Sequence, residues 1–162
     1  MTARPHTATT PRDVVAAVVD PELQVLSIED LGVLRAVEMD GAGRIIVTIT
    51  PTYSGCPAME MIRADIRTAL AGAGYPEVEI VTALAPAWST DWISESGRTK
   101  LSSAGIAPPG RVAGPVPLTL SVKCPRCGSL DTERLSEFGS TACKALWRCR
   151  SCHEPFDQVK PL

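Results

Sequence analysis

The alternation of apolar and polar positions in the first hundred residues changes period several times, and each change predicts an element. A helix is expected over residues 11–19, where Thr10 is placed to cap its start and Asp20, with the proline after it, to end it. β-Branched residues then predict strands at 33–38 and 44–50, joined by a glycine-containing turn that favours antiparallel pairing.

Helical spacing returns after the second of these strands. Apolar residues recur every three to four positions over 58–70 and stop at a glycine-rich end, which predicts a second helix. Alternation at 78–83 predicts a third strand, and a further helix is expected from Ser89 or Thr90 to about Ala104. The order α-β-β-α-β predicts an α/β (α+β) fold, a small open sandwich with its helices on one face of the sheet.

The pattern changes again after residue 104. Glycine and proline are dense over 105–117, which predicts an interdomain linker. Short β-like runs then surround two cysteine pairs and predict a small C-terminal ribbon with strands at 118–122, 132–136 and 141–148. The predicted organisation is a disordered tail at 1–9, an α/β domain at 10–104, the linker at 105–117 and the ribbon at 118–162.

Composition and charge narrow the setting of this chain. Its 162 residues are 44% apolar and 21% charged, as is typical of a soluble globular protein, and a net charge of −2 gives no reason to expect nucleic acid or a membrane as partner. The first residues lack the apolar segment of a signal peptide, so a cytoplasmic protein is expected. In that compartment the six cysteines are interpreted as metal ligands or reactive thiols rather than as disulfides.

The strongest local signal is a pair of C-x-x-C motifs, which supply Cys124, Cys127, Cys149 and Cys152. Two such pairs can surround one tetrahedral ion, and a small ribbon with few large apolar side chains needs this support. The prediction is a zinc ribbon whose ion is structural, because four protein sulfurs leave no open position. A rubredoxin-like iron site is the alternative, although His153 stands where a second glycine is expected for that class.

A lone cysteine, Cys56, lies between a predicted strand and a predicted helix, with Gly55 before it and Pro57 after it. The free N–H groups and the dipole of a helix start favour a thiolate, which is the nucleophilic and metal-binding form of cysteine. The alternative interpretation is an ordinary buried cysteine, because free cysteine is among the most buried residue types. Supporting hydroxyls and carboxylates are expected from Thr50, Thr52, Ser54, Asp20 and Glu22.

Two auxiliary candidates lie in the ribbon outside its C-x-x-C motifs. Strand alternation would place Cys143 on one face with Ala145 and Trp147, which favours a small buried side chain over a ligand. His153 is interpreted as a solvated or outer residue rather than a fifth ligand. No Ser/His/Asp set and no phosphate-binding loop before a helix is found, so catalytic residues are not predicted.

Several segments carry a family pattern. They are D-P-E at 20–22, S-I-E-D-L-G at 27–32, V-T-I-T-P-T-Y-S-G-C-P-A-M at 47–59 and D-I at 65–66. Together they resemble the iron-sulfur cluster assembly domain family, which includes SufT and the eukaryotic cytosolic targeting factors. The segments at 86–92, 105–109, 138–146 and 154–156 are similar to one branch, PaaD, which is encoded with phenylacetyl-CoA epoxidase; the resemblance covers about residues 11–162.

This resemblance implies a maturation factor, a non-catalytic accessory protein of the phenylacetyl-CoA 1,2-epoxidase system in aerobic phenylacetate catabolism. The cysteine of the family maps onto Cys56, where a transient iron-sulfur cluster would be bound or handed over. The implied client is the reductase component of the oxygenase with its [2Fe-2S] centre, and the hydroxylase and a second copy of the chain are further partners. A second thiolate would come from a dimer partner, from the client or from Cys143, and an intermolecular bridge is favoured.

Two other functions stay open at this stage. The chain could be a stoichiometric scaffold or binding subunit of the oxygenase that transfers no cluster. It could also be a thiol-dependent enzyme, but it has just two histidines, near the two ends of the chain, and neither is close in sequence to Cys56.

Overall fold

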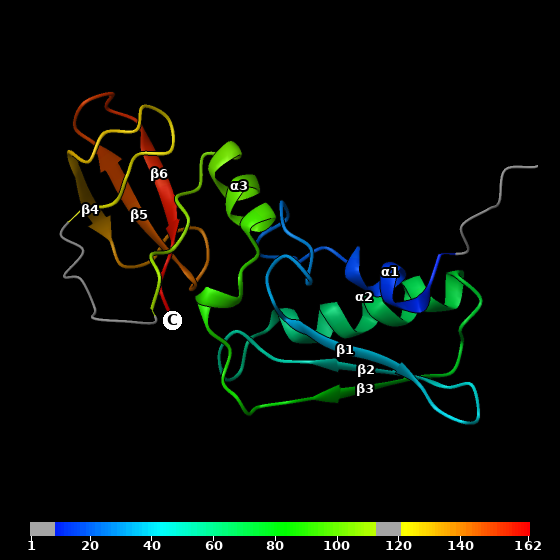
Figure 1. The fold of residues 1–162 in the computed structure, drawn as a ribbon. Helices are drawn as coiled ribbons and strands as arrows, with labels where there is room; N and C mark the ends of the chain where they lie inside the picture. The colour runs from blue at the N-terminus through cyan, green and yellow to red at the C-terminus, as the bar shows by residue number, and fades with distance from the viewer. Residues whose placement is uncertain (1–8, 113–120) are drawn as a thin grey trace, which may run out of the picture.

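The computed structural model of the chain describes residues 9–112 and 121–162. These residues form an α/β part with one three-stranded sheet and a ribbon with another, and the two parts lie side by side (Figure 1). Most of the predicted tail at 1–9, the end of the predicted linker and most of the predicted strand at 118–122 lie outside the described residues.

The α/β part has the predicted order of elements. Strand β2 lies in the middle of the sheet, antiparallel to β1 and parallel to β3, and both helices lie on one face (Figure 1). The elements are α1 Pro11–Ala16, β1 Leu34–Met39, β2 Ile45–Ile49, α2 Ala58–Gly72 and β3 Val78–Thr82. The prediction of an open α-β-β-α-β sandwich is confirmed.

Helix α1 starts as predicted and ends earlier. The Thr10 hydroxyl accepts the Asp13 N–H at 3.2 Å, and the Asp13 carboxylate accepts the Thr10 N–H at 2.9 Å, which together satisfy free donors of the first turn. The helix ends at Ala16 because Val19 is extended and forms an isolated antiparallel bridge with Ser27. The predicted extension to residue 19 is therefore wrong.

The predicted third helix is split in two. Ser89 caps a 3₁₀ turn, η1 Thr90–Trp92, and Ser94 caps the helix α3 Glu95–Ser103 by accepting the Gly97 N–H at 2.9 Å. The chain is extended at Ile93 between them, so each piece needs its own cap. Among the described residues, no helix combines the length and the apolar character needed to cross a lipid bilayer.

The main core lies between the sheet and α2. Side chains at helical spacing on α2 meet alternate side chains of β2, and the largest of these are fully buried: Ile45, Val47, Ile49, Ile62, Ile66 and Leu70. Burying each such side chain contributes about 1.5–3 kcal/mol. The same contacts fix the start of α2, and therefore the place of Cys56, relative to the end of β2.

The ribbon is an antiparallel sheet of β4 Thr132–Ser136, β5 Lys144–Cys149 and β6 Pro155–Val159, with β5 in the middle. Its third strand is β6 rather than the predicted strand at 118–122, whose described residues are not in a strand. Strand β6 begins with Pro155, and proline is tolerated at the first position of a strand. The prediction of a three-stranded ribbon is confirmed with this change of strand.

The segment predicted as a linker begins in contact with the ribbon. Ala107 is buried, its N–H donates to the Asp157 carbonyl at 2.8 Å, and its carbonyl accepts the Val159 N–H at 3.1 Å. Val159 in turn belongs to the apolar core of the α/β part, and the Leu162 carbonyl accepts the Thr90 N–H at 3.0 Å. The end of the ribbon therefore packs directly on the α/β part.

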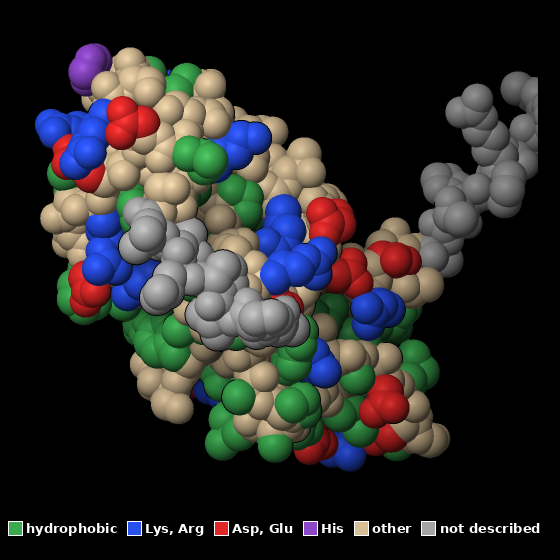
Figure 2. Space-filling model, turned by 60° about the vertical axis from the view of Figure 1, so that its left-hand side comes forward, with side chains coloured by type: hydrophobic (Ala, Val, Ile, Leu, Met, Phe, Trp, Pro, Cys, Tyr) green, Lys and Arg blue, Asp and Glu red, His purple; other side chains and the backbone are tan. Residues whose placement is uncertain are grey.

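Charges of both signs alternate on the ribbon surface. Arg150 lies 2.8 Å from Glu133, and Arg126 lies 4.0 Å from Glu154. Figure 2 shows basic and acidic side chains next to one another on the face that it presents. Such neighbours neutralise each other's charge, in agreement with the small net charge of the chain.

Candidate functional site

The four cysteines of the two C-x-x-C motifs converge at the end of the ribbon. All four sulfurs lie within 4.8 Å of one another, with 3.8 Å between Cys124 and Cys152 and 3.5 Å between Cys127 and Cys149. Each motif is followed by a left-handed residue, Gly128 or His153, whose positive φ turns the chain around the sulfurs. His153 is exposed and lies outside this set.

A backbone group favours the thiolate form of one of these cysteines, Cys149. The Cys152 N–H donates to the Cys149 sulfur at 3.5 Å, and this bond is the main reason why the pKa of Cys149 is lowered to about 6. A thiolate is the form that binds a metal, and four of them match tetrahedral coordination. The residues therefore fit a metal ion held by four sulfurs, with no position open for a substrate.

Cys56 occupies the predicted place before α2. Its carbonyl accepts the Met59 N–H in the first turn, and its own N–H donates to the Tyr53 carbonyl, each at 3.3 Å. Pro57 stands at the cap position, and no side chain caps this helix. The Cys56 side chain is only 9% exposed and lies between two cavities, one on each side of the loop.

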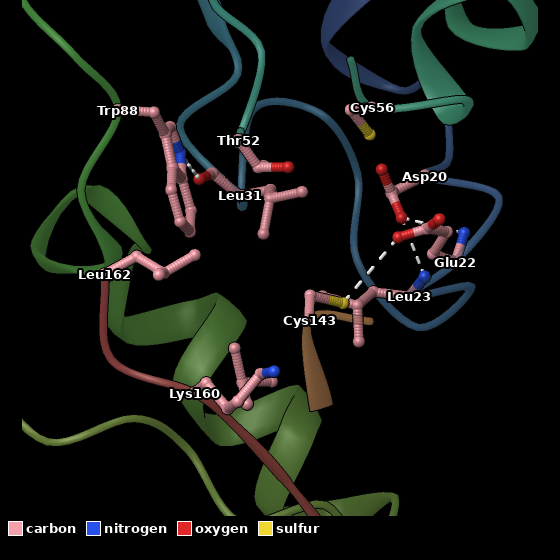
Figure 3. A pocket seen from close by; sticks show the side chains of 11 residues that line it. Asp20, Glu22, Leu23, Leu31, Thr52, Cys56, Trp88, Cys143, Lys160 and Leu162 are labelled. Atoms are coloured by element: carbon pink, nitrogen blue, oxygen red, sulfur yellow. Dashed lines mark hydrogen bonds between the residues drawn. The ribbon is translucent and has the colours of Figure 1, made fainter. Parts of the chain in front are cut away.

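We call the cavity between the α/β part and the ribbon the inner pocket (Figure 3). It has a volume of about 20 Å³, which is room for about one water molecule. Leu31, Trp88 and Leu162 supply apolar walls. Its polar lining consists of Asp20, Glu22, Thr52, Cys56, Cys143 and Lys160.

We call the cavity on the other side of Cys56 the outer pocket. It is open and much larger, about 370 Å³, and reaches from the Cys56 loop to the end of β3. Arg63 lines it, donates to the Thr82 hydroxyl at 2.6 Å and forms an ion pair with Glu60. Cys56 is thus a shared wall of a closed small cavity and an open large one.

The ionisable groups of the inner pocket are perturbed by burial. Asp20 is 4% exposed, and burial raises its pKa although one of its oxygens accepts the Glu22 and Leu23 N–H groups at 2.9 and 2.7 Å. Burial also raises the pKa of Cys143, whose thiol donates to the Glu22 carboxylate at 3.7 Å. Burial and then the charges of Cys56 and Glu22 raise the pKa of Tyr53 to about 12, so its hydroxyl stays protonated.

The raised pKa of Asp20 gives a stability prediction. A carboxyl whose pKa is raised by folding contributes stability below its unfolded pKa, and this contribution is lost as the pH rises through the folded pKa. Asp20→Asn keeps an acceptor for both N–H groups and removes the charge. We expect it to increase the free energy of unfolding at neutral pH by about 1 kcal/mol in urea denaturation, with the gain shrinking in acid.

Asp40→Asn is the control, because the effect has the opposite sign. The Arg44 N–H and the rest of its turn lower the pKa of Asp40, so its charge stabilises the fold at neutral pH and the stability falls in acid. Asp40→Asn should therefore lower the free energy of unfolding at neutral pH. A loss of stability in Asp20→Asn as well would contradict the assignment of a burial cost to Asp20.

The structure separates the other predicted site residues. Thr52 and Asp20 line the inner pocket with Cys56, and Ser54 lines the outer one. Thr50 lines neither of these two pockets; it is 2% exposed, and its N–H donates to the Val33 carbonyl at 2.9 Å.

Cys143 lies elsewhere than strand alternation suggested. Strand β5 begins only at Lys144, and Cys143 is half-buried and faces the inner pocket rather than the ribbon core (Figure 3). The interpretation that groups it with Ala145 and Trp147 is therefore wrong. Sequence reasoning also missed Lys160 and Leu162 at this pocket, because β6, which leads to them, was not predicted.

Comparisons with known proteins agree with this division of the chain. Residues 12–83 match the model of a family described as iron-sulfur cluster assembly protein, and residues 112–160 match the model of the PaaD zinc beta ribbon domain. The first match contains Cys56, and the second contains the four ribbon cysteines and Cys143.

Individual relatives match either the whole chain or its first part. The chain is 50% identical over 141 residues to an Escherichia coli protein named as one of the subunits of 1,2-phenylacetyl-CoA epoxidase, covering 87% of this chain and 85% of that protein. It is 38% identical over 87 residues to the Fe-S protein maturation auxiliary factor YitW of Bacillus subtilis, covering 52% of this chain and 82% of that protein. A crystal structure of a domain of unknown function, DUF59, from Bacillus anthracis covers 56% of this chain and 87% of its own, with 29% identity and a TM-score of 0.53.

Proposed function

Because the chain belongs to the PaaD family, we propose that it is a non-catalytic accessory protein that assembles or delivers iron-sulfur clusters for a phenylacetyl-CoA epoxidase system. The names of its relatives support an accessory role in iron-sulfur metabolism. The proposed client is the reductase component, whose [2Fe-2S] centre must be inserted after synthesis, and the proposed compartment is the cytoplasm, where thiols stay reduced.

The observation that carries this proposal is the place of Cys56 beside the outer pocket. A cavity of about 370 Å³ next to a cysteine at a helix start can admit a cluster from outside. One protein sulfur leaves most positions of the cluster to other ligands. Such incomplete ligation suits a donor that must release its cargo, with the remaining thiolates supplied by the client or by a second copy of the chain.

For the four ribbon cysteines we propose zinc. Sulfur-only, tetrahedral sets of this spacing are typical of structural zinc, and the second C-x-x-C motif is followed by His153 rather than a glycine. In this proposal the zinc ribbon holds the wall of the inner pocket in place. It takes no part in cluster chemistry, because its ion has no open position.

The test of the proposed function is Cys56→Ala. We expect the variant to fold with the wild-type free energy of unfolding to within about 1 kcal/mol and to lower the iron and sulfide content of the co-expressed reductase at least tenfold. Iron and acid-labile sulfide analysis of the purified reductase measures the effect. Arg67→Ala, an exposed change on α2, is the matched control and should leave loading unchanged. A fully loaded reductase from cells that carry only Cys56→Ala would contradict the proposal.

A scaffold function is the second candidate, because the relative that matches most of the chain is named as a subunit of the epoxidase. It predicts stable, stoichiometric co-purification with the hydroxylase, and the same co-purification with Cys56→Ala. The cluster content of the reductase would then be independent of Cys56.

A further inference from the structure

The inner pocket brings together two thiols and two carboxylates from three distant segments. Asp20 and Glu22 follow α1, Cys56 precedes α2, and Cys143 precedes β5 in the ribbon (Figure 3). The set is therefore complete only when the ribbon is packed on the α/β part. Thiolates and carboxylates are metal ligands, and none of these four belongs to the ribbon cluster.

Asp20 holds one oxygen toward this pocket without a partner. Its Oδ1 accepts the two backbone N–H groups, whereas no hydrogen bond or ion pair to Oδ2 occurs among the described residues. In Figure 3 this second oxygen points toward the sulfur of Cys56. A carboxylate oxygen without a protein partner keeps its lone pairs free for a further ligand, and a bound cation would be such a ligand.

The basic side chains near the pocket have other partners. The buried Lys144 acts on Asp20 and Cys143 through its charge, but its ammonium donates to the Ser140 hydroxyl at 3.0 Å. The Lys160 ammonium lies over the ring of Phe138, 4.6 Å from its centroid, and within the described part of the chain neither Asp20 nor Glu22 has an ion pair with a basic side chain. The Cys143 thiol donates its one proton to Glu22 Oε2, and the sulfur and this oxygen lie 3.7 Å apart. A metal ion in place of this proton would be held by both atoms.

The volume of the inner pocket limits the size of what it can bind. About 20 Å³ holds one water molecule or one ion and is too small for a two-iron cluster. Mixed sulfur and carboxylate ligands suit a first-row divalent ion such as Fe²⁺, Co²⁺ or Zn²⁺ and disfavour Mg²⁺ or Ca²⁺.

We propose that the inner pocket binds a single divalent transition-metal ion through Cys56, Cys143, Asp20 and Glu22. Under the proposed function this ion is ferrous iron. Binding releases the thiol protons of both cysteines to solvent, and no electron is transferred. The pocket would thus supply iron to the cluster that contacts the same Cys56 from the outer side. This role rests on the proposed function, whereas the binding itself does not.

The proposed ion is weakly held and exchangeable. Within the described residues, the ribbon cysteines are the one group of three or more metal-ligating side chains that already converge. The inner donors must rotate toward one another before they can share an ion, and this ordering reduces affinity. A site that delivers its ion must bind it less tightly than the ribbon cysteines bind theirs, because the delivered ion has to dissociate.

The test is an anaerobic titration of the full chain with Co²⁺, after the ribbon has been loaded with Zn²⁺. We expect wild-type protein to bind one further equivalent, with thiolate-to-cobalt charge-transfer absorption and without loss of zinc. Cys143→Ser and Glu22→Gln should each weaken this binding at least tenfold. Glu137→Gln, an exposed carboxylate on the ribbon surface, is the matched control and should bind as the wild type does.

Two results would overturn the inference. One is the absence of cobalt binding beyond the ribbon, and the other is equal binding by wild type and Cys143→Ser when both retain zinc and the same unfolding midpoint. The cobalt titration tests metal binding by the inner pocket independently of the proposed function, because the titration is done without the reductase. The cluster content of the reductase in Cys56→Ala cells judges the proposed function alone.

Discussion

Cys149→Ser is expected to unfold the ribbon. Cys149 is fully buried in the ribbon core and is one of four sulfurs that converge on a single point. Metal binding supplies about 10–16 kcal/mol of apparent free energy in small zinc domains, far more than an apolar cluster of this size. We expect loss of stoichiometric metal and protease sensitivity throughout residues 121–162, measured by metal analysis and limited proteolysis.

Cys143→Ser is the matched control for this change. It also removes a ribbon thiol, but that thiol lies outside the converging set and faces the inner pocket. It should retain the metal and the protease resistance of the wild type. A folded, metal-free Cys149→Ser protein would contradict a structural role for the ion. If wild-type protein purified without added metal were coloured and contained stoichiometric iron, the ion of the ribbon would be assigned as iron and not as zinc.

The α/β part could be predicted because its signals are local. The capping box of Thr10 and Asp13, the β-branched run of β2 and the helical spacing of α2 each depend on residues close in sequence. The pairing of β1 with β2 through a short turn is local as well. Where prediction failed, contacts outside the element decide the local conformation. After α1, Val19 forms a bridge with Ser27, and between η1 and α3 the Ser94 N–H donates to the Asp30 carbonyl at 2.9 Å.

The ribbon metal site was also predictable, because the ligand spacing is itself the signal. Its strands were less so: they are short, and β6 starts with Pro155, which strand propensities disfavour. The prediction that Cys143 shares a face with Ala145 and Trp147 was wrong because the start of the strand was misplaced. Lys144 is the first residue of β5, so the alternation that holds along the strand does not extend to the residue before it.

The inner pocket could not be derived from the sequence. Cys143 is 121 positions from Glu22, whose carboxylate accepts its thiol proton, and no periodicity connects such positions. The contact depends on how the ribbon packs on the α/β part, through Val159 and the hydrogen bond between Leu162 and Thr90. The sequence supplied the candidate residues, and tertiary packing determines which of them meet.

Gly32→Ala is expected to lower the free energy of unfolding by about 3 kcal/mol, from left-handed backbone strain and from a steric clash. Gly32 has φ +76°, and a Cβ there would lie 2.7 Å from the Trp92 Cβ and 2.9 Å from the Trp92 carbonyl oxygen. Backbone cannot move aside as a flexible side chain can. The loop before β1 and the η1 turn would separate, and with them Leu31 and Trp88, which line the inner pocket and are joined by a 2.9 Å hydrogen bond.

Two other glycines separate the strain from the clash. Gly43 also has a positive φ of +84°, but a Cβ there meets nothing within 4 Å, so Gly43→Ala should cost only about 1 kcal/mol. Gly41 has neither a positive φ nor a close neighbour, and Gly41→Ala should be neutral to within about 0.5 kcal/mol. Urea denaturation of the three variants at one pH measures the series. Equal losses for Gly32→Ala and Gly43→Ala would show that Trp92 yields to the new methyl group. The greater loss for Gly32→Ala that we expect means that this contact with Trp92 holds the α/β loop against η1, and so helps to keep the apolar wall of the inner pocket in place.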